Sequence, residues 1–123
     1  MNRWIGVAIL PLALWACEAS EPTVAAVPPE RAAALYLEHC AICHGEAGDG
    51  RGPRRGSLHE RPTDFRRKDW RDGRTLAELR KVIREGRPGT DMPAWRTLPD
   101  ADIAGLAEYV LSLGAAPSAR TER

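Results

Sequence analysis

Apolar residues recur at the spacing of an α-helix in three stretches of the chain, separated by long segments rich in glycine and proline. The first helix is predicted from residue 28 or 29 to about 44, the second from 75 to 85, and the third from about 99 to 113. Apolar and polar residues nowhere alternate for long enough to predict a β-strand. The pattern therefore predicts an all-α fold.

Each predicted helix has an apolar face. The apolar positions are Ala32, Leu35, Tyr36 and Cys40 in the first helix, Leu76, Leu79, Val82 and Ile83 in the second, and Ile103, Leu106, Ala107, Val110 and Leu113 in the third. Thr75 and Glu78 have the spacing of a capping box, which fixes the start of the second helix. Gly86 is expected to end that helix, because Pro88 prevents it from continuing.

The pentapeptide Cys40-Ala41-Ile42-Cys43-His44 ends the first predicted helix and has the CxxCH spacing of covalent c-type haem attachment. In this chemistry each thiol forms a thioether with one haem vinyl group, and the adjacent histidine binds the iron as the proximal ligand. The spacing therefore predicts one covalently attached haem c.

A CxxC pair also occurs in redox dithiols and in zinc sites. A redox dithiol is expected within a βαβ pattern, which this chain lacks. A zinc site needs four ligands, and only Cys17, His39 and His59 remain outside the pentapeptide. Haem attachment is the interpretation that the local sequence favours.

The iron of such a haem has a second axial position, for which the chain offers few ligands. Met92 is the only methionine beyond the N-terminal segment, and it lies in a Gly/Pro-rich loop off both neighbouring apolar faces. His59 lies in a polar, basic loop, and His39 is constrained by its place next to Cys40. Met92 is the predicted ligand, with His59 or an open, water-bound position as alternatives. His/Met ligation would fill both axial positions and favour electron transfer over catalysis.

The N-terminal residues predict export from the cytoplasm. Residues 1–16 combine Arg3 with an apolar run shorter than the ~20 residues that cross a bilayer, as in a signal peptide. The end of that run, Leu14-Trp15-Ala16-Cys17, resembles a bacterial lipoprotein cleavage box and predicts a lipid anchor on Cys17, ordinary cleavage being the alternative. Residues 17–29 are then a tether, 30–114 one folded domain, and 115–123 a disordered tail.

Together these features resemble the class I cytochromes c of the small, single-haem bacterial type. The resemblance extends from about residue 31 to 113 and is carried by Cys40, Cys43, His44, Gly45, Gly52, Pro53, Met92, Pro93, Trp95, Leu106 and Tyr109. It implies a cytochrome c fold, in which three main helices and Gly/Pro-rich loops surround the haem.

The resemblance also implies supporting roles. The Pro53 carbonyl is expected to accept a hydrogen bond from Nδ1 of His44. The first and last helices are expected to cross at Ala32, Tyr36, Leu106 and Tyr109. Because Ala32 stands where the family usually has glycine, the crossing is expected to be slightly wider. Residues 61–65 and Trp70 are expected to cover the haem edge and to contact its propionates, a solvated loop being the alternative.

Charge is distributed unevenly along a chain whose formal net charge is only +1. Residues 51–87 include thirteen basic and six acidic side chains, whereas residues 18–50 include one basic and six acidic. The basic region would steer an exposed haem edge toward an acidic partner protein, although an ordinary solvated loop has the same composition. No motif for nucleic-acid recognition is present.

The predicted function is single-electron transfer by a periplasmic or otherwise extracytoplasmic, membrane-tethered cytochrome. It would exchange electrons with redox partner proteins, as a monomer or as part of a complex, without itself being an enzyme. The alternatives are a haem c subunit of a larger respiratory oxidoreductase and an open-site haem sensor or peroxidase.

Overall fold

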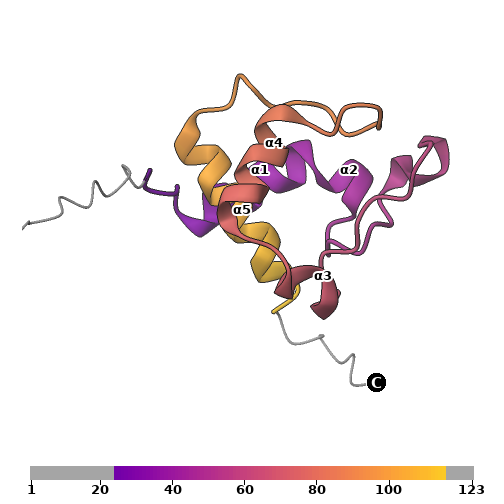
Figure 1. Ribbon diagram of the computed structural model, residues 1–123, viewed down its shortest axis with the longest axis horizontal. Coiled ribbons are helices and arrows are strands. Elements are labelled where there is room, and N and C mark those ends of the chain that lie inside the picture. Colours follow the sequence, from indigo (N-terminus) through magenta and orange to yellow (C-terminus); the bar gives the residue numbers. More distant parts are fainter. Residues whose placement is uncertain (1–23, 116–123) are drawn as a thin grey trace, which may run out of the picture.

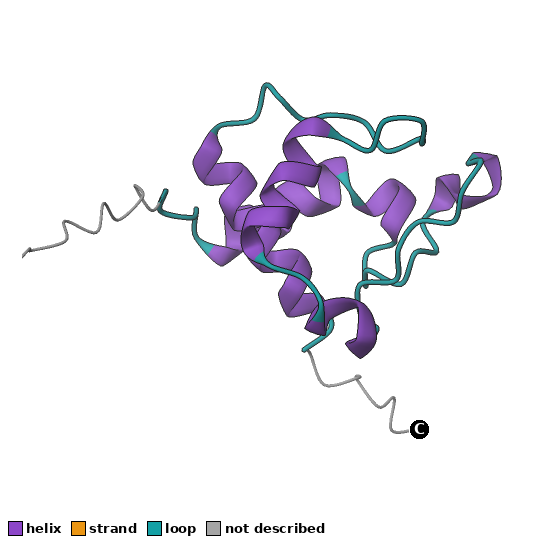
Figure 2. Ribbon diagram, in the orientation of Figure 1, coloured by secondary structure: helices purple, strands orange, loops and turns teal. Residues whose placement is uncertain are grey.

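The computed structural model describes residues 24–115, which form helices joined by long loops (Figure 1). The elements are α1 (Pro29–His39), α2 (Ala41–His44), the 3₁₀ helix η1 (Pro53–Ser57), α3 (Lys68–Asp72), α4 (Leu76–Glu85) and α5 (Asp100–Leu113). No strand occurs in this range, as Figure 2 shows. The predicted all-α fold is thus confirmed. The predicted signal peptide, Cys17 and residues 116–123 of the predicted tail lie outside the described residues.

The first predicted helix is in fact two helices with a break at Cys40. The Cys40 N–H still bonds the Tyr36 carbonyl at 2.9 Å, so α1 keeps its helical pattern up to that point. The Cys40 carbonyl then accepts from both Cys43 N and His44 N, which begins the short helix α2. Gly45 ends α2 with a φ of +80°, a conformation that favours glycine. The two cysteines therefore lie around a turn rather than along one continuous helix.

Helices α1 and α5 cross as predicted, and their contact is the most deeply buried part of the core. Tyr36 and Leu106 are almost fully buried, and the Tyr36 and Tyr109 rings lie 5.2 Å apart between centroids. Ala32 on α1 stands where similar cytochromes usually have glycine, but α5 has a glycine, Gly105, at the same crossing. A Cβ on Gly105 would lie 3.4 Å from that of Ala32 and 2.5 Å from Cγ2 of Val27. Gly105 thereby offsets the extra methyl group of Ala32.

The same helix pair is joined by an ion pair and by the segment before α1. Arg31 donates two hydrogen bonds, of 2.8 and 2.7 Å, to the carboxylate of the buried Asp102. These bonds lower the pKa of Asp102, so it stays ionised at neutral pH. The Val27 N–H bonds the Ala101 carbonyl at 3.2 Å. The packed domain therefore begins by Val27, earlier than the boundary at residue 30 that the sequence predicted.

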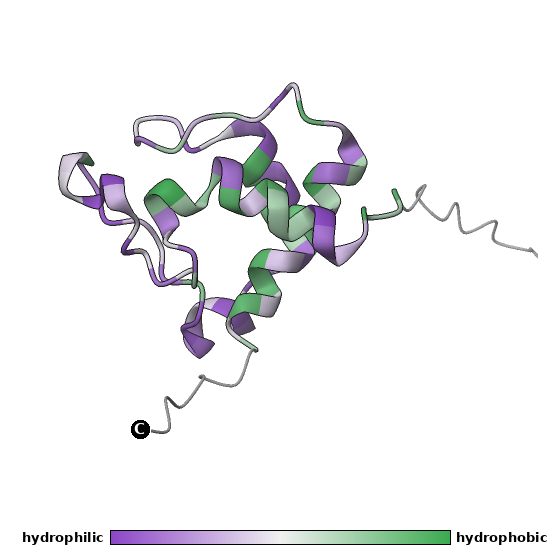
Figure 3. Cartoon of the chain, turned by 180° about the vertical axis from the view of Figure 1, so that it is seen from behind, coloured by the Kyte–Doolittle hydropathy of each residue, from purple (hydrophilic) through white to green (hydrophobic). Residues whose placement is uncertain are grey.

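Helix α4 has the end signals that the sequence predicted. The Thr75 hydroxyl accepts from Glu78 N at 3.2 Å, and the Glu78 carboxylate accepts from Thr75 N at 2.9 Å, which completes the capping box. Gly86 ends the helix with a φ of +69°. Helix α4 packs on α5, and Figure 3 shows that strongly apolar residues concentrate on the packed helices. The loops that leave this helical core form the rest of the site.

Candidate haem site

A cavity of about 270 Å³ lies between the helices and two long loops, residues 51–63 and 86–95. The residues predicted to hold the haem, Cys40, Cys43, His44 and Met92, all line it. Most of the remaining wall is apolar: Leu79, Val82 and Ile83 from α4, Leu106 and Val110 from α5, Trp70 from α3, and Phe65, Pro93 and Trp95 from the loops. The fold thus brings the CxxCH segment and the Met92 loop, distant in sequence, to one largely apolar space.

The two cysteines of the pentapeptide are free thiols in the cavity wall, both partly buried. Burial, together with the neighbouring Cys43, raises the pKa of the Cys40 thiol to about 12. Gly52 packs directly against the turn that carries them. A Cβ at Gly52 would lie 2.4 Å from the Ile42 carbonyl oxygen and 2.6 Å from that of Ala41. Only glycine allows the returning loop to approach this turn so closely.

His44 is oriented by two contacts from the loop before α3. Its Nδ1 lies 3.3 Å from the Thr63 carbonyl oxygen, and its ring stacks on Phe65 with centroids 4.5 Å apart. Burial lowers the pKa of His44, although the Thr63 hydrogen bond opposes that shift, so the neutral imidazole is favoured. A neutral ring that donates from Nδ1 leaves Nε2 unprotonated, which is the tautomer that a metal requires.

Thr63 holds the place that the sequence assigned to Pro53. Pro53 is exposed at the start of η1, and its carbonyl does not contact His44. The reason is the close packing of Gly52, after which the chain turns outward into η1 and returns to His44 only at Thr63. The predicted acceptor, the Pro53 carbonyl, was therefore wrong, although a carbonyl of the same loop, that of Thr63, does accept from Nδ1.

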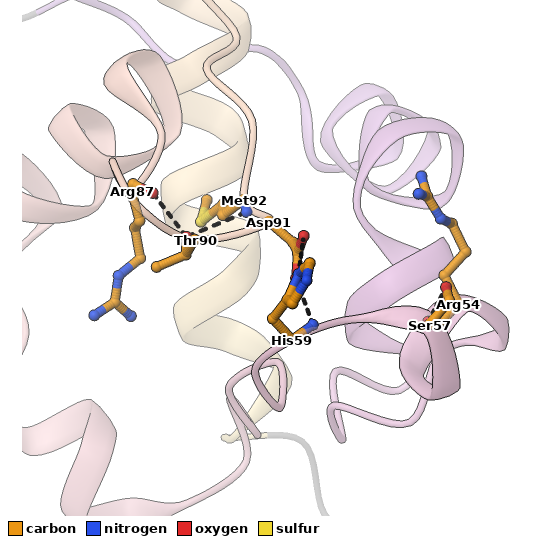
Figure 4. Close-up of polar contacts among 7 residues, drawn as sticks. All are labelled: Arg54, Ser57, His59, Arg87, Thr90, Asp91 and Met92. Carbon is orange, nitrogen blue, oxygen red and sulfur yellow. Dashed lines mark hydrogen bonds and ion pairs between the residues drawn. The ribbon is translucent and has the colours of Figure 1, made fainter.

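Met92 lies in a loop whose backbone is held by its own turn (Figure 4). Met92 N donates to the Thr90 hydroxyl at 3.2 Å, and that hydroxyl donates to the Arg87 carbonyl at 2.7 Å. Arg87 N in turn donates to the Met92 carbonyl at 3.2 Å. The half-buried Met92 side chain thus projects into the cavity from a fixed piece of backbone.

The two other histidines are placed differently. The His59 ring is 90% exposed and is bonded to Asp91, and His59 is not among the residues that line the cavity. Its backbone N–H also donates to Asp91 and is the largest cause of the lowered pKa of that carboxyl. His39 lines the cavity, with its ring 4.7 Å from that of Trp95. The geometry thus disfavours His59 as an iron ligand.

Comparison with known proteins identifies the domain. The family model described as cytochrome c oxidase, cbb3-type, subunit III matches residues 27–110. The chain belongs to this cytochrome c family. The cytochrome is 34% identical to cytochrome c55X of Paracoccus denitrificans over 98 residues, which cover 72% of this chain and 82% of that protein.

Other relatives are larger proteins. The cbb3-type cytochrome c oxidase subunit CcoP of Azospirillum brasilense is 37% identical over 90 residues, covering 72% of this chain and 30% of that subunit. The cytochrome therefore spans 26–30% of the length of the oxidase subunits that it matches. A solved structure of the reducing HAO-like protein complex of Kuenenia stuttgartiensis aligns with a TM-score of 0.60 at 25% identity, covering 72% of this chain and 44% of that chain.

Membership of this family means that the cytochrome binds haem c covalently. The cavity fits such a group, because it combines two free thiols, an imidazole with the required tautomer, a thioether and an apolar wall. Arginines line it as well: Arg61, Arg74 and Arg87. Arg74 lies over the Trp70 ring at 5.9 Å. Four residues of the segment predicted to cover the haem edge, and Trp70, line the cavity: Arg61, Pro62, Thr63 and Phe65.

Sequence reasoning missed several contributors to this site. Phe65 was predicted only as part of the segment over the haem edge, yet it forms the stacking surface for His44. Thr63 acts through its backbone carbonyl, which no side-chain pattern marks. Gly86 was expected to end a helix, but it also contacts the backbone of residues 92–94. A positive φ at a helix end is predictable from sequence, whereas that second contact is tertiary.

Proposed function

We propose that this cytochrome carries single electrons through one haem c, attached to Cys40 and Cys43 and ligated by His44 and Met92. The observation that carries the proposal is the convergence of these four side chains on one largely apolar cavity. The haem supplies the one-electron chemistry when bound. Both axial positions are then occupied by protein, which favours electron transfer over binding of a substrate to the iron.

The chain's own residues orient the proximal ligand and exclude water. Thr63 and Phe65 fix the plane and tautomer of His44. Apolar side chains of α4 and α5 close the back of the cavity. A dry, rigid surrounding keeps the ligands in one arrangement in both oxidation states, which lowers the reorganisation that each electron transfer requires.

We further propose that the protein works outside the cytoplasm, with Cys17 as its lipid anchor. The support is the apolar N-terminal run and the resemblance of Leu14 to Cys17 to a lipoprotein cleavage box. Within residues 24–115, no helix has the length and apolar character that a membrane crossing needs. Its relatives include oxidase subunits, so service as the haem c subunit of a larger complex is the second candidate function.

The function is tested on protein purified from a host with its haem-attachment machinery intact. We expect a mass increased by one haem that survives denaturation, a reversible one-electron titration, and a reduced spectrum that carbon monoxide leaves unchanged. A bare polypeptide would refute haem attachment. A carbon monoxide complex of the native protein would favour the open-site sensor or peroxidase instead. Co-purification of other redox subunits after detergent extraction would favour the complex-subunit candidate.

The partner is proposed to be acidic and to approach over η1. Much of the basic segment after η1 is neutralised locally, because Arg66, Arg67 and Lys68 each pair with a nearby aspartate. The exposed arginines just before and within η1 differ. Arg51, Arg54 and Arg55 make no ion pair with any described residue. Their charge lies on the loop whose later residues, Leu58 and Glu60 to Thr63, line the cavity.

Two triple variants with equal change in net charge test this surface. We expect Arg51→Gln/Arg54→Gln/Arg55→Gln to slow oxidation of the reduced protein by hexacyanoferrate(III) about threefold to tenfold at low ionic strength, since charge steering changes association rates by ~10-fold or more. The matched control is Arg66→Gln/Arg67→Gln/Lys68→Gln, which should have a smaller effect. Stopped-flow rates at two salt concentrations decide the question. Equal slowing in both triples would mean that only total charge matters.

A further inference from the structure

Two loops border the cavity mouth, and one residue pair joins them. The loop of residues 51–63 includes η1 and ends at Thr63, the partner of His44; the loop of residues 86–95 carries Met92. Among the described residues, the hydrogen bonds between these loops all come from His59 and Asp91. The sequence gives no sign of this link, because the two residues are 32 positions apart.

The link consists of both backbone and side-chain contacts. His59 N donates to Asp91 Oδ2 at 2.6 Å, and His59 Nδ1 lies 3.1 and 3.2 Å from the two carboxylate oxygens. An exposed ion pair by itself contributes little, and the His59 ring is 90% exposed. The short bond from a backbone N–H to an ionised carboxylate is of a stronger class. Most of the link therefore depends on Asp91 rather than on the imidazole.

Asp91 immediately precedes Met92, so the link acts next to the predicted ligand. Figure 4 shows Asp91 directed toward His59 on the opposite loop, while the neighbouring Thr90 and Arg87 hold the other side of the Met92 turn. The opposite loop is itself fixed, since Gly52 N bonds the Cys43 carbonyl at 3.1 Å and Thr63 contacts His44. The pair thus connects the loop that orients the proximal histidine with the loop that presents the methionine.

We propose that His59 and Asp91 are positioning residues that hold the Met92 loop closed over the haem and so set how readily the methionine leaves the iron. This inference rests on the proposed function, specifically on Met92 as an axial ligand. Opening of the 86–95 loop would need the bond to Asp91 to break first. An external ligand that competes with methionine therefore has to overcome this link as well as the iron–sulfur bond.

The test uses the ferric, haem-loaded protein with imidazole as the competing ligand. Loss of the methionine–iron charge-transfer band reports binding, and the rate at saturating imidazole reports how fast Met92 leaves. Asp91→Ala, which removes all three contacts, is expected to raise both the imidazole affinity and this limiting rate about tenfold. His59→Ala keeps the backbone N–H, and Asp91→Asn keeps an oxygen acceptor, so each should raise them about threefold or less.

Asp69→Ala is the matched control, because it removes an exposed carboxylate, in the first turn of α3, that pairs with Arg67. It should leave both quantities unchanged, and melting temperatures of all variants show whether any effect is global. The inference is overturned if Asp91→Ala behaves like Asp69→Ala, or if Asp91→Asn shows no rescue. Failure of the proposed function looks different: the unaltered protein would then lack the charge-transfer band, or Met92→Ala would leave imidazole affinity unchanged.

Discussion

Met92→Ala is expected to abolish the methionine–iron charge-transfer band and to lower the reduction potential. A thioether ligand favours ferrous iron relative to nitrogen donors or water, so its loss stabilises the ferric state. We expect a fall on the order of 0.1 V or more, within the ~0.8 V over which axial ligands set haem potentials. The variant should also bind carbon monoxide, because one axial position becomes open. Absorption spectroscopy and a redox titration measure these changes.

Met92→His separates loss of the ligand from change of the ligand. A histidine at this position should also remove the band and lower the potential, but it should keep both axial positions filled and so resist carbon monoxide. Alanine and histidine variants that respond alike to carbon monoxide would show that residue 92 does not reach the iron. A band that survives in Met92→Ala would refute the ligand assignment outright.

Helices and caps were predictable because their signals are local. The capping box of Thr75 and Glu78 and the stop at Gly86 are contained in a dozen consecutive residues, and the structure has both. The break at Cys40 was not predictable in this way. It separates two segments that are each helical, and the second of them is held by Gly52 of the following loop, a contact that the local sequence does not encode. The short elements η1 and α3 were missed because single turns have too little periodicity to detect.

The residues of the candidate site also fall into those that local sequence identifies and those that only the tertiary structure identifies. Side chains whose chemistry is specific, the two cysteines, His44 and Met92, were identified from spacing and scarcity, and the fold brings them to one cavity. Contributors that act through the backbone or through shape were not identified: Thr63 uses a carbonyl, and Phe65 uses the face of its ring. Their roles depend on where a loop returns, which local sequence does not determine.

Two glycines of the Met92 loop show how far backbone placement alone controls the predicted ligand. Gly86 and Gly89 both have positive φ, +69° and +80°. A Cβ on Gly86 would lie 2.8 Å from Met92 O, from Pro93 C and from Ala94 N, which are all backbone atoms. A Cβ on Gly89 would meet nothing within 4 Å. Alanine at either site carries backbone strain on the order of 1–3 kcal/mol, but only at Gly86 must the ligand loop move.

Gly86→Ala is therefore expected to displace Met92, with a large loss of the charge-transfer band and at least a tenfold gain in imidazole affinity. Gly89→Ala should show the backbone strain as a lower melting temperature while it keeps the band. Spectra and melting curves of the two ferric variants, measured side by side, separate strain from displacement. If both variants lose the band equally, general loosening of the loop explains the result, and the close contact of Gly86 with residues 92–94 has no special role. If only Gly86→Ala loses it, the position of the sulfur is set by the packing of this one α-carbon against the backbone that carries the methionine.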